Sequence, residues 1–77
     1  MTLWDLKEGQ DARIKSFENP LNQKQIQRLQ DLGFRKGETI HCNKHIPFNG
    51  PRLFCSGDSI FSLAQDIAQH ILLEDIK

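Results

Sequence analysis

Residues 28–37 read Arg-Leu-Gln-Asp-Leu-Gly-Phe-Arg-Lys-Gly, and they mark the end of a helix more clearly than any other local signal in the chain. Gly33 stands where the backbone must turn left-handed to leave a helix, which glycine does without steric cost. Phe34 can then fold back onto Leu29 in the preceding turn. The stretch therefore predicts a helix that ends at Gly33 and a chain that turns again at Gly37.

The body of this helix is predicted from the residues upstream. Ile26, Leu29 and Leu32 recur every third residue and draw a narrow apolar stripe along it. Asn22 is suited to cap the N-terminus, and Gln25 stands at the reciprocal position of a capping box. We therefore expect one short amphipathic helix that begins after Asn22.

Strand signals surround the helix. Residues 11–17 alternate apolar and polar side chains and then slip at Phe17, which predicts a strand with a bulge near its end. Glycine and proline punctuation predicts four more strands and, between the last two, a short helical turn. The predicted strands are residues 39–46, 52–56, 59–63 and 71–76, and the helical turn is residues 64–70.

The alternation of side chains predicts which residues share a face. Ile40, Cys42 and Ile46 fall on one face of their strand, and Leu53 and Cys55 fall on one face of the next. Short strands in a chain of 77 residues tend to hide their edges by curling into a barrel. We therefore expect a single domain over residues 1–77: a mainly β small barrel of about five strands, with one helix after the first strand.

Composition limits what this domain does and where. Ten Lys and Arg balance ten Asp and Glu, which argues against a dedicated nucleic-acid binder. No apolar run approaches the roughly 20 residues that a membrane-spanning helix needs, and the first residues do not form a signal peptide. We expect a cytoplasmic protein whose two cysteines are reduced thiols.

Four segments in the same order resemble the FeoA family. Residues 28–37 are similar to the family's Arg-Leu-x-x-Leu-Gly turn, and residues 3–9 are similar to its Leu-x-x-Leu-x-x-Gly start. Residues 46–51, Ile-Pro-Phe-Asn-Gly-Pro, resemble its Pro-rich loop, and residues 62–71 resemble its closing segment. Ala64 and Lys36 depart from the family, which often has Arg and Pro there. The chain is thereby identified as a FeoA-like domain with an SH3-like fold.

The resemblance implies a function. FeoA proteins are cytosolic accessory proteins of bacterial ferrous iron uptake, and their implied partner is FeoB, a membrane transporter with a cytosolic GTPase part. The chain would dock on that part and modulate the transporter, reaching the membrane only through it. No activated nucleophile or acid–base pair can be assembled from the sequence, so we do not expect an enzyme or a required cofactor. A homo-oligomer stays open, because a barrel edge can pair with its twin.

Loop residues are the predicted contacts with this partner. Phe48 and Asn49 lie in the Pro-rich loop, and Phe34, Arg35 and Lys36 follow the helix. For Phe48, an anchor in a partner and a cap folded back on the barrel are equally compatible with the sequence.

The alternative function is a metal-binding or metal-sensing domain. His41 and His45 would share one face of a regular strand, with Cys42 on the other. Two histidines are fewer ligands than a tight zinc site needs. His41 and His45 are therefore weak candidates for divalent transition-metal binding. Cys42 and Cys55 are expected to be small core hydrophobes.

Overall fold

A computed structural model describes residues 1–48 and 50–74 of the chain. Its elements follow the predicted order of strand, helix, three strands, helical turn and strand, preceded by a short 3-10 helix. They are η1 (Leu3–Asp5), β1 (Asp11–Phe17), α1 (Gln23–Asp31), β2 (Thr39–His45), β3 (Arg52–Ser56), β4 (Ser59–Leu63), α2 (Gln65–Ala68) and β5 (Ile71–Leu73). The prediction of a mainly β fold with one helix after the first strand is confirmed.

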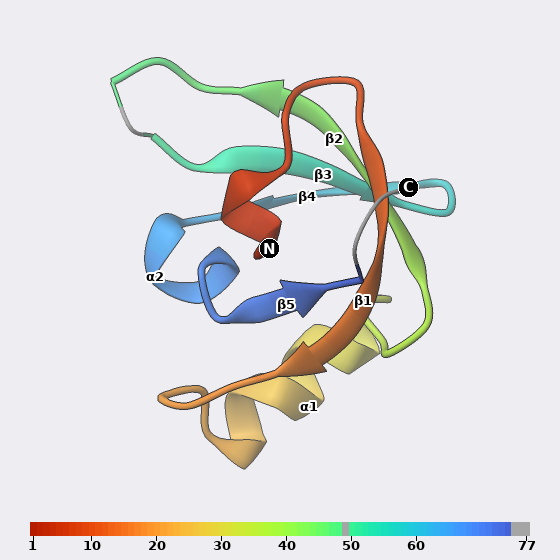
Figure 1. The fold of residues 1–77 in the computed structure, drawn as a ribbon, viewed down its shortest axis with the longest axis vertical. Helices are drawn as coiled ribbons and strands as arrows, with labels where there is room; N and C mark the ends of the chain where they lie inside the picture. The colour runs from red at the N-terminus through yellow and green to blue at the C-terminus, as the bar shows by residue number, and fades with distance from the viewer. Residues whose placement is uncertain (49, 75–77) are drawn as a thin grey trace.

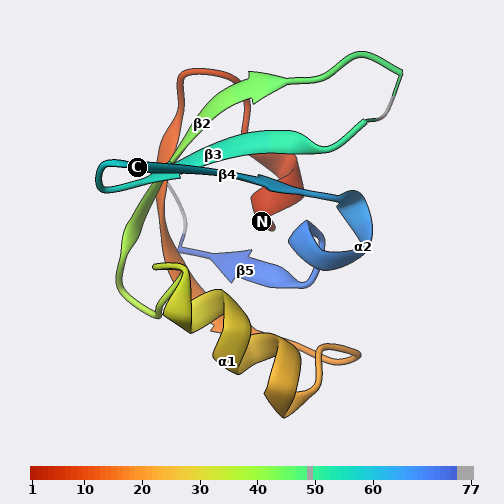
Figure 2. The ribbon, with the colours of Figure 1, turned by 180° about the vertical axis from the view of Figure 1, so that it is seen from behind.

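The five strands form one antiparallel sheet in the order β4-β3-β2-β1-β5. The sheet curls around the core, as a small barrel requires, and the N-terminal 3-10 helix lies inside the curl (Figure 1). Seen from behind, α1 covers one end of the molecule and the β2–β3 hairpin extends from the other (Figure 2). No helix among the described residues is long and apolar enough to cross a membrane.

The core is built from every element. Phe34 and Phe54 are its largest fully buried side chains, and the rings of Phe34 and Phe61 meet edge to face with their centroids 5.7 Å apart. Trp4 packs against this core and is partly buried. The other buried residues are Leu3, Leu6, Ala12, Ile14, Leu21, Leu29, Ile40, Cys42, Leu63, Ala68, Ile71 and Leu73.

Both ends of α1 follow the sequence prediction. Asn22 Oδ1 accepts from the Gln25 amide at 2.8 Å, and Gln25 Oε1 accepts from the Asn22 amide at 3.0 Å, which completes a capping box. At the other end, the Phe34 amide donates to the Leu29 carbonyl at 2.9 Å and the Gly33 amide donates to the Gln30 carbonyl at 3.1 Å. These two bonds define a Schellman motif, with Gly33 at a φ of 106°.

Two irregularities bend the sheet. The first falls between Ile14 and Ser16 in β1, close to the predicted bulge. The second falls between Cys42 and Lys44 in β2, where the pairing with β3 shifts, and the sequence did not indicate it.

The β2 bulge corrects the predicted face of Ile46. Ile40 and Cys42 are fully buried, but Ile46 lies beyond the strand and is 37% exposed, so it does not share their face. On β3, Leu53 and Cys55 share one face as predicted, but that face is only half-buried, and Phe54 between them enters the core. The prediction of a core cysteine is therefore confirmed for Cys42 and only partly for Cys55.

Candidate partner-binding surface

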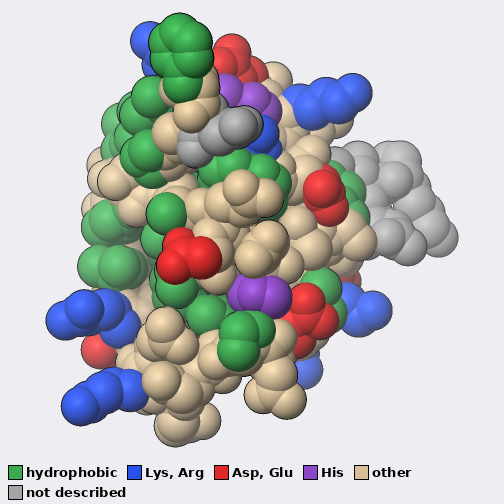
Figure 3. Space-filling view, turned by 90° about the vertical axis from the view of Figure 1, so that its left-hand side faces the viewer, with side chains coloured by type: hydrophobic (Ala, Val, Ile, Leu, Met, Phe, Trp, Pro, Cys, Tyr) green, Lys and Arg blue, Asp and Glu red, His purple; other side chains and the backbone are tan. Residues whose placement is uncertain are grey.

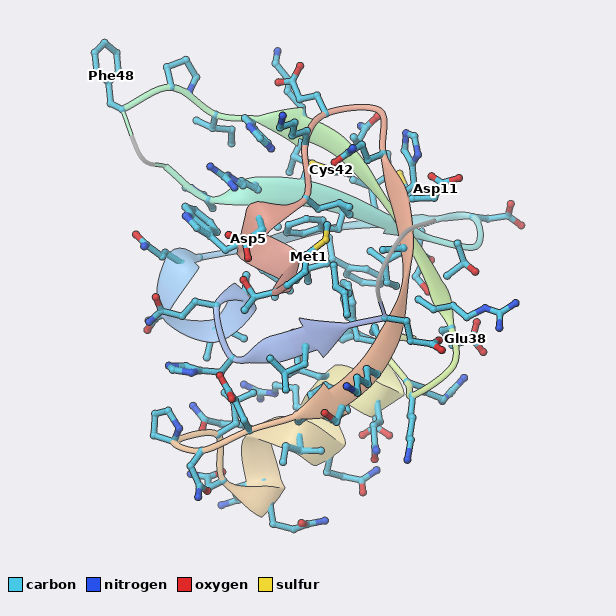
Figure 4. The ribbon with its side chains drawn as sticks, in the orientation of Figure 1. Met1, Asp5, Asp11, Glu38, Cys42 and Phe48 are labelled. Carbon is cyan, nitrogen blue, oxygen red and sulfur yellow. The ribbon has the colours of Figure 1, made fainter. Side chains whose placement is uncertain are left out.

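Phe48 stands at the end of the β2–β3 hairpin with its side chain fully exposed at 101%. It points away from the body of the molecule (Figure 4). Its φ of 62° is a left-handed value that a side chain as large as Phe rarely adopts. Phe48 therefore does not fold back as a cap on the barrel.

The neighbours of Phe48 extend the apolar surface. Ile46 and Pro47 precede it and are both exposed. Figure 3 views the molecule from this side and shows apolar side chains at the hairpin end. Asn49, the second predicted contact in this loop, lies outside the described residues. We call Ile46, Pro47 and Phe48 the hairpin tip.

The base of the hairpin is tied to the N-terminal segment. The Arg52 guanidinium lies 3.9 Å from the centroid of the Trp4 ring and also donates to the Trp4 carbonyl. On the facing strand, His45 Nε2 pairs with the Leu6 carbonyl at 2.9 Å, and the His45 amide donates to Glu8 at 2.8 Å. These contacts fix the base of the hairpin, so the hairpin tip loses less conformational entropy when a partner binds it.

The other predicted contacts do not join the hairpin tip. Phe34 is fully buried in the core, which corrects its prediction as a contact residue: the Schellman turn folds it back under the sheet. Arg35 and Lys36 are exposed, but they follow α1 at the opposite end of the molecule (Figures 1 and 2). Arg35 and Lys36 therefore do not form one continuous patch with the hairpin tip.

The bulge also separates the two candidate metal-binding histidines. His41 pairs with Cys55, and His45 pairs with Arg52 on the other side of the register shift. Because the extra residue reverses the alternation, His41 faces outward while His45 turns inward toward Leu6. The expectation that these histidines share a face is therefore wrong.

A shallow apolar groove lies between α1, β4 and α2, which sequence reasoning missed. Its volume is about 230 Å³. Leu29, Leu32, Leu63 and Ile67 form most of its lining, with Gln25 and Arg28 beside them. Leu32 ends the predicted apolar stripe of α1, yet it is 38% exposed, because it faces this groove rather than the core. The apolar stripe of α1 is the one feature of the sequence that could have indicated this groove.

Burial shifts the pKa of one cysteine in the sheet. Cys42 lies in the core, and burial raises the pKa of its thiol above the ordinary value, since removing a thiolate from water is costly. Cys42 is therefore a neutral core residue at pH 7.

Comparison with known structures places this fold in a class. FeoA from Stenotrophomonas maltophilia in complex with zinc, described as a prokaryotic SH3 domain protein, matches with a TM-score of 0.82 and 29% identity, covering 96% of this chain and 89% of that one. Iron(II) transport protein A from Clostridium thermocellum matches with a TM-score of 0.87 and 30% identity, covering 96% of this chain and 44% of that one. The fold is thus an SH3-like barrel.

A similar domain forms part of a longer chain of known structure. ScaR with bound Cd²⁺ matches with a TM-score of 0.81 and 28% identity, covering 99% of this chain but only 35% of that one. Among curated proteins, the search finds no match. The FeoA domain family matches residues 1–75. The chain therefore belongs to the FeoA family, which is associated with ferrous iron transport.

Proposed function

We propose that this protein is a cytoplasmic accessory factor of ferrous iron uptake that docks on the cytosolic GTPase part of a FeoB-type transporter and modulates it. Membership of the FeoA family supports the link to iron transport. The S. maltophilia relative is itself described as a candidate ferrous iron transport activating factor.

The observation that carries the docking proposal is the full exposure of Phe48 on an anchored hairpin. Moving an exposed aromatic side chain from water into a partner's pocket is strongly favourable, and aromatic side chains contribute most of the binding free energy in many protein interfaces. Burying one Phe in a partner pocket contributes about 1.5–3 kcal/mol, which corresponds to roughly 10- to 150-fold in affinity.

Calorimetric titration of the purified cytosolic part of the transporter with the whole chain tests this proposal. Phe48→Ala is expected to weaken binding by about 10-fold or more, because the anchor is lost while the core is untouched. Ile60→Ala is the matched control, since Ile60 is an apolar side chain that is 57% exposed and lies on β4, away from the hairpin tip. Circular dichroism confirms that both variants fold. Undiminished binding by Phe48→Ala contradicts the proposal.

A further inference from the structure

The apolar groove between α1, β4 and α2 adjoins a polar pocket. Gln25 and Arg28 line both hollows. The polar pocket has a volume of about 330 Å³, and its other lining residues are Asn22 and Lys24. The two hollows therefore form one continuous surface along α1 that is apolar at one end and cationic at the other.

The cations of this surface have no acidic partner within the part of the chain that the structure describes. Each ion pair there uses a histidine, and neither includes Lys24 or Arg28. Asp31 is the one acidic residue of α1, and its Oδ1 accepts a hydrogen bond from Gln27 at 3.1 Å. Lys24 and Arg28 are both exposed. The cationic end of the surface is therefore complementary to a carboxylate from another molecule.

The apolar end is suited to a short protein segment. The residues of α1 that line it recur three and four positions apart, at 25, 28, 29 and 32, so the groove follows one face of the helix for about two turns, roughly 11 Å. Leu32 leaves 38% of its surface in water there. A small ligand is usually enclosed by its pocket, which a shallow groove does not do. The shape therefore favours a segment of another protein.

We propose that this surface, lined by Lys24, Arg28, Leu29 and Leu32 and here called the α1 groove, docks a short amphipathic helix of a partner protein. Aliphatic side chains of that helix pack on Leu29 and Leu32, as when the ridges of one helix fill the grooves of another. Its carboxylates pair with Arg28 and Lys24, and a basic helix with the same aliphatic residues is rejected because it brings like charges together.

The α1 groove is a second docking surface. α1 and the hairpin tip lie at opposite ends of the molecule (Figures 1 and 2). Docking in the α1 groove therefore does not depend on the function proposed for the hairpin tip, and the two are tested by different variants.

Nuclear magnetic resonance titration of the whole ¹⁵N-labelled chain with a synthetic peptide tests the proposal. The peptide is helical, is capped at both ends, and carries two leucines four residues apart and two glutamates one turn further on. We expect saturable shifts of the amide signals of the α1 groove, and weaker binding as NaCl is raised. A comparison peptide with lysines in place of the glutamates should bind about 5-fold or more weakly. Absence of saturable shifts with the acidic peptide, or equal affinity for both peptides, overturns the proposal.

Variants assign the contacts. Leu32→Ala should weaken binding of the acidic peptide by roughly 5- to 30-fold, because part of the apolar contact is lost. Arg28→Gln should weaken it by about 2- to 5-fold and reduce its salt dependence. Lys15→Gln is the matched control for charge, since Lys15 is exposed on β1 outside the α1 groove, and Phe48→Ala is the control for the hairpin tip. Both controls should bind the peptide as the wild type does. Unchanged affinity in Leu32→Ala, or equal losses in Arg28→Gln and Lys15→Gln, overturns the proposal.

Two other occupants of the α1 groove give different results. A wild-type dimer in analytical ultracentrifugation that Leu32→Ala abolishes would assign the groove to a second copy of the chain. Displacement of the peptide by decanoate at the same concentration would assign it to a lipid carboxylate. Either result overturns the proposal, whereas a monomer from which decanoate does not displace the peptide supports it.

Discussion

Replacing Gly33 by alanine tests the turn that joins α1 to the sheet. Gly33 has a φ of 106°, and an added Cβ would lie 2.8 Å from Ser56 Oγ. That hydroxyl donates to the Gly33 carbonyl at 3.1 Å, so the substitution both strains the backbone and displaces a hydrogen-bonded group. The backbone strain costs about 1–2 kcal/mol. Loss of the hydrogen bond costs about 1 kcal/mol more.

We therefore expect Gly33→Ala to lower the free energy of unfolding by about 2–3 kcal/mol, measured from urea unfolding curves. In a domain of this size, that lowers the melting temperature by roughly 8–24 °C. Gly37→Ala is the matched control, because Gly37 has a similar φ of 89° but nothing within 4 Å of an added Cβ. Gly37→Ala should lose only the strain contribution of about 1–2 kcal/mol.

A second substitution isolates the close approach. In a Ser56→Ala background the hydroxyl is gone, so Gly33→Ala should cost no more than Gly37→Ala does in the wild type. If Gly33→Ala is neutral, the assignment of the Schellman turn as a constraint is refuted. If Gly33→Ala and Gly37→Ala cost the same in the wild type, the contact with Ser56 carries no energy.

Three further predictions concern the core and the hairpin base. Phe54→Ala should cost about 3–5 kcal/mol, because Phe54 is fully buried, and should leave the chain largely unfolded in thermal scans. Burial raises the pKa of Cys42, so the stability that its neutral thiol contributes is complete below the ordinary thiol pKa and is lost as the pH rises through the raised pKa. Above pH ~9, the urea midpoint of the wild type should therefore fall more steeply than that of Cys42→Ala. Arg52→Ala should lower the free energy of unfolding by about 1–2 kcal/mol, because it removes the stacking on Trp4 and the hydrogen bond to the Trp4 carbonyl. It should also change the fluorescence of Trp4, and an unchanged emission spectrum would contradict that packing.

The sequence predicted the parts of the fold that local chemistry determines. The capping box at Asn22 and the exit of α1 at Gly33 depend on residues within five positions of each other, so they could be read directly. The Gly57-Asp58 turn followed for the same reason.

The bulge after Cys42 is different, because β2 reads as an ordinary alternating strand and its extra residue is set by pairing with β3. The errors about the histidines and Ile46 follow from this long-range pairing. The bulge turned His45 inward and separated it from His41, and it left Ile46 exposed. The Schellman turn folds Phe34 back locally, and the Phe61 ring that it meets in the core lies 27 positions later in the chain. The pairing of His41 with Cys55 likewise needed the register, which no local pattern specifies.

The most direct test of docking through the hairpin tip is to place a photoreactive amino acid at position 48 and, in a second variant, at position 60. Each protein is irradiated with native membranes that contain the transporter, and the adducts are identified by mass spectrometry. Phe48 and Ile60 are both exposed apolar residues, so non-specific labelling should affect them equally. We predict adducts with the transporter's GTPase part from position 48 and none from position 60. Equal labelling from both positions, or labelling from position 60 alone, would contradict the account.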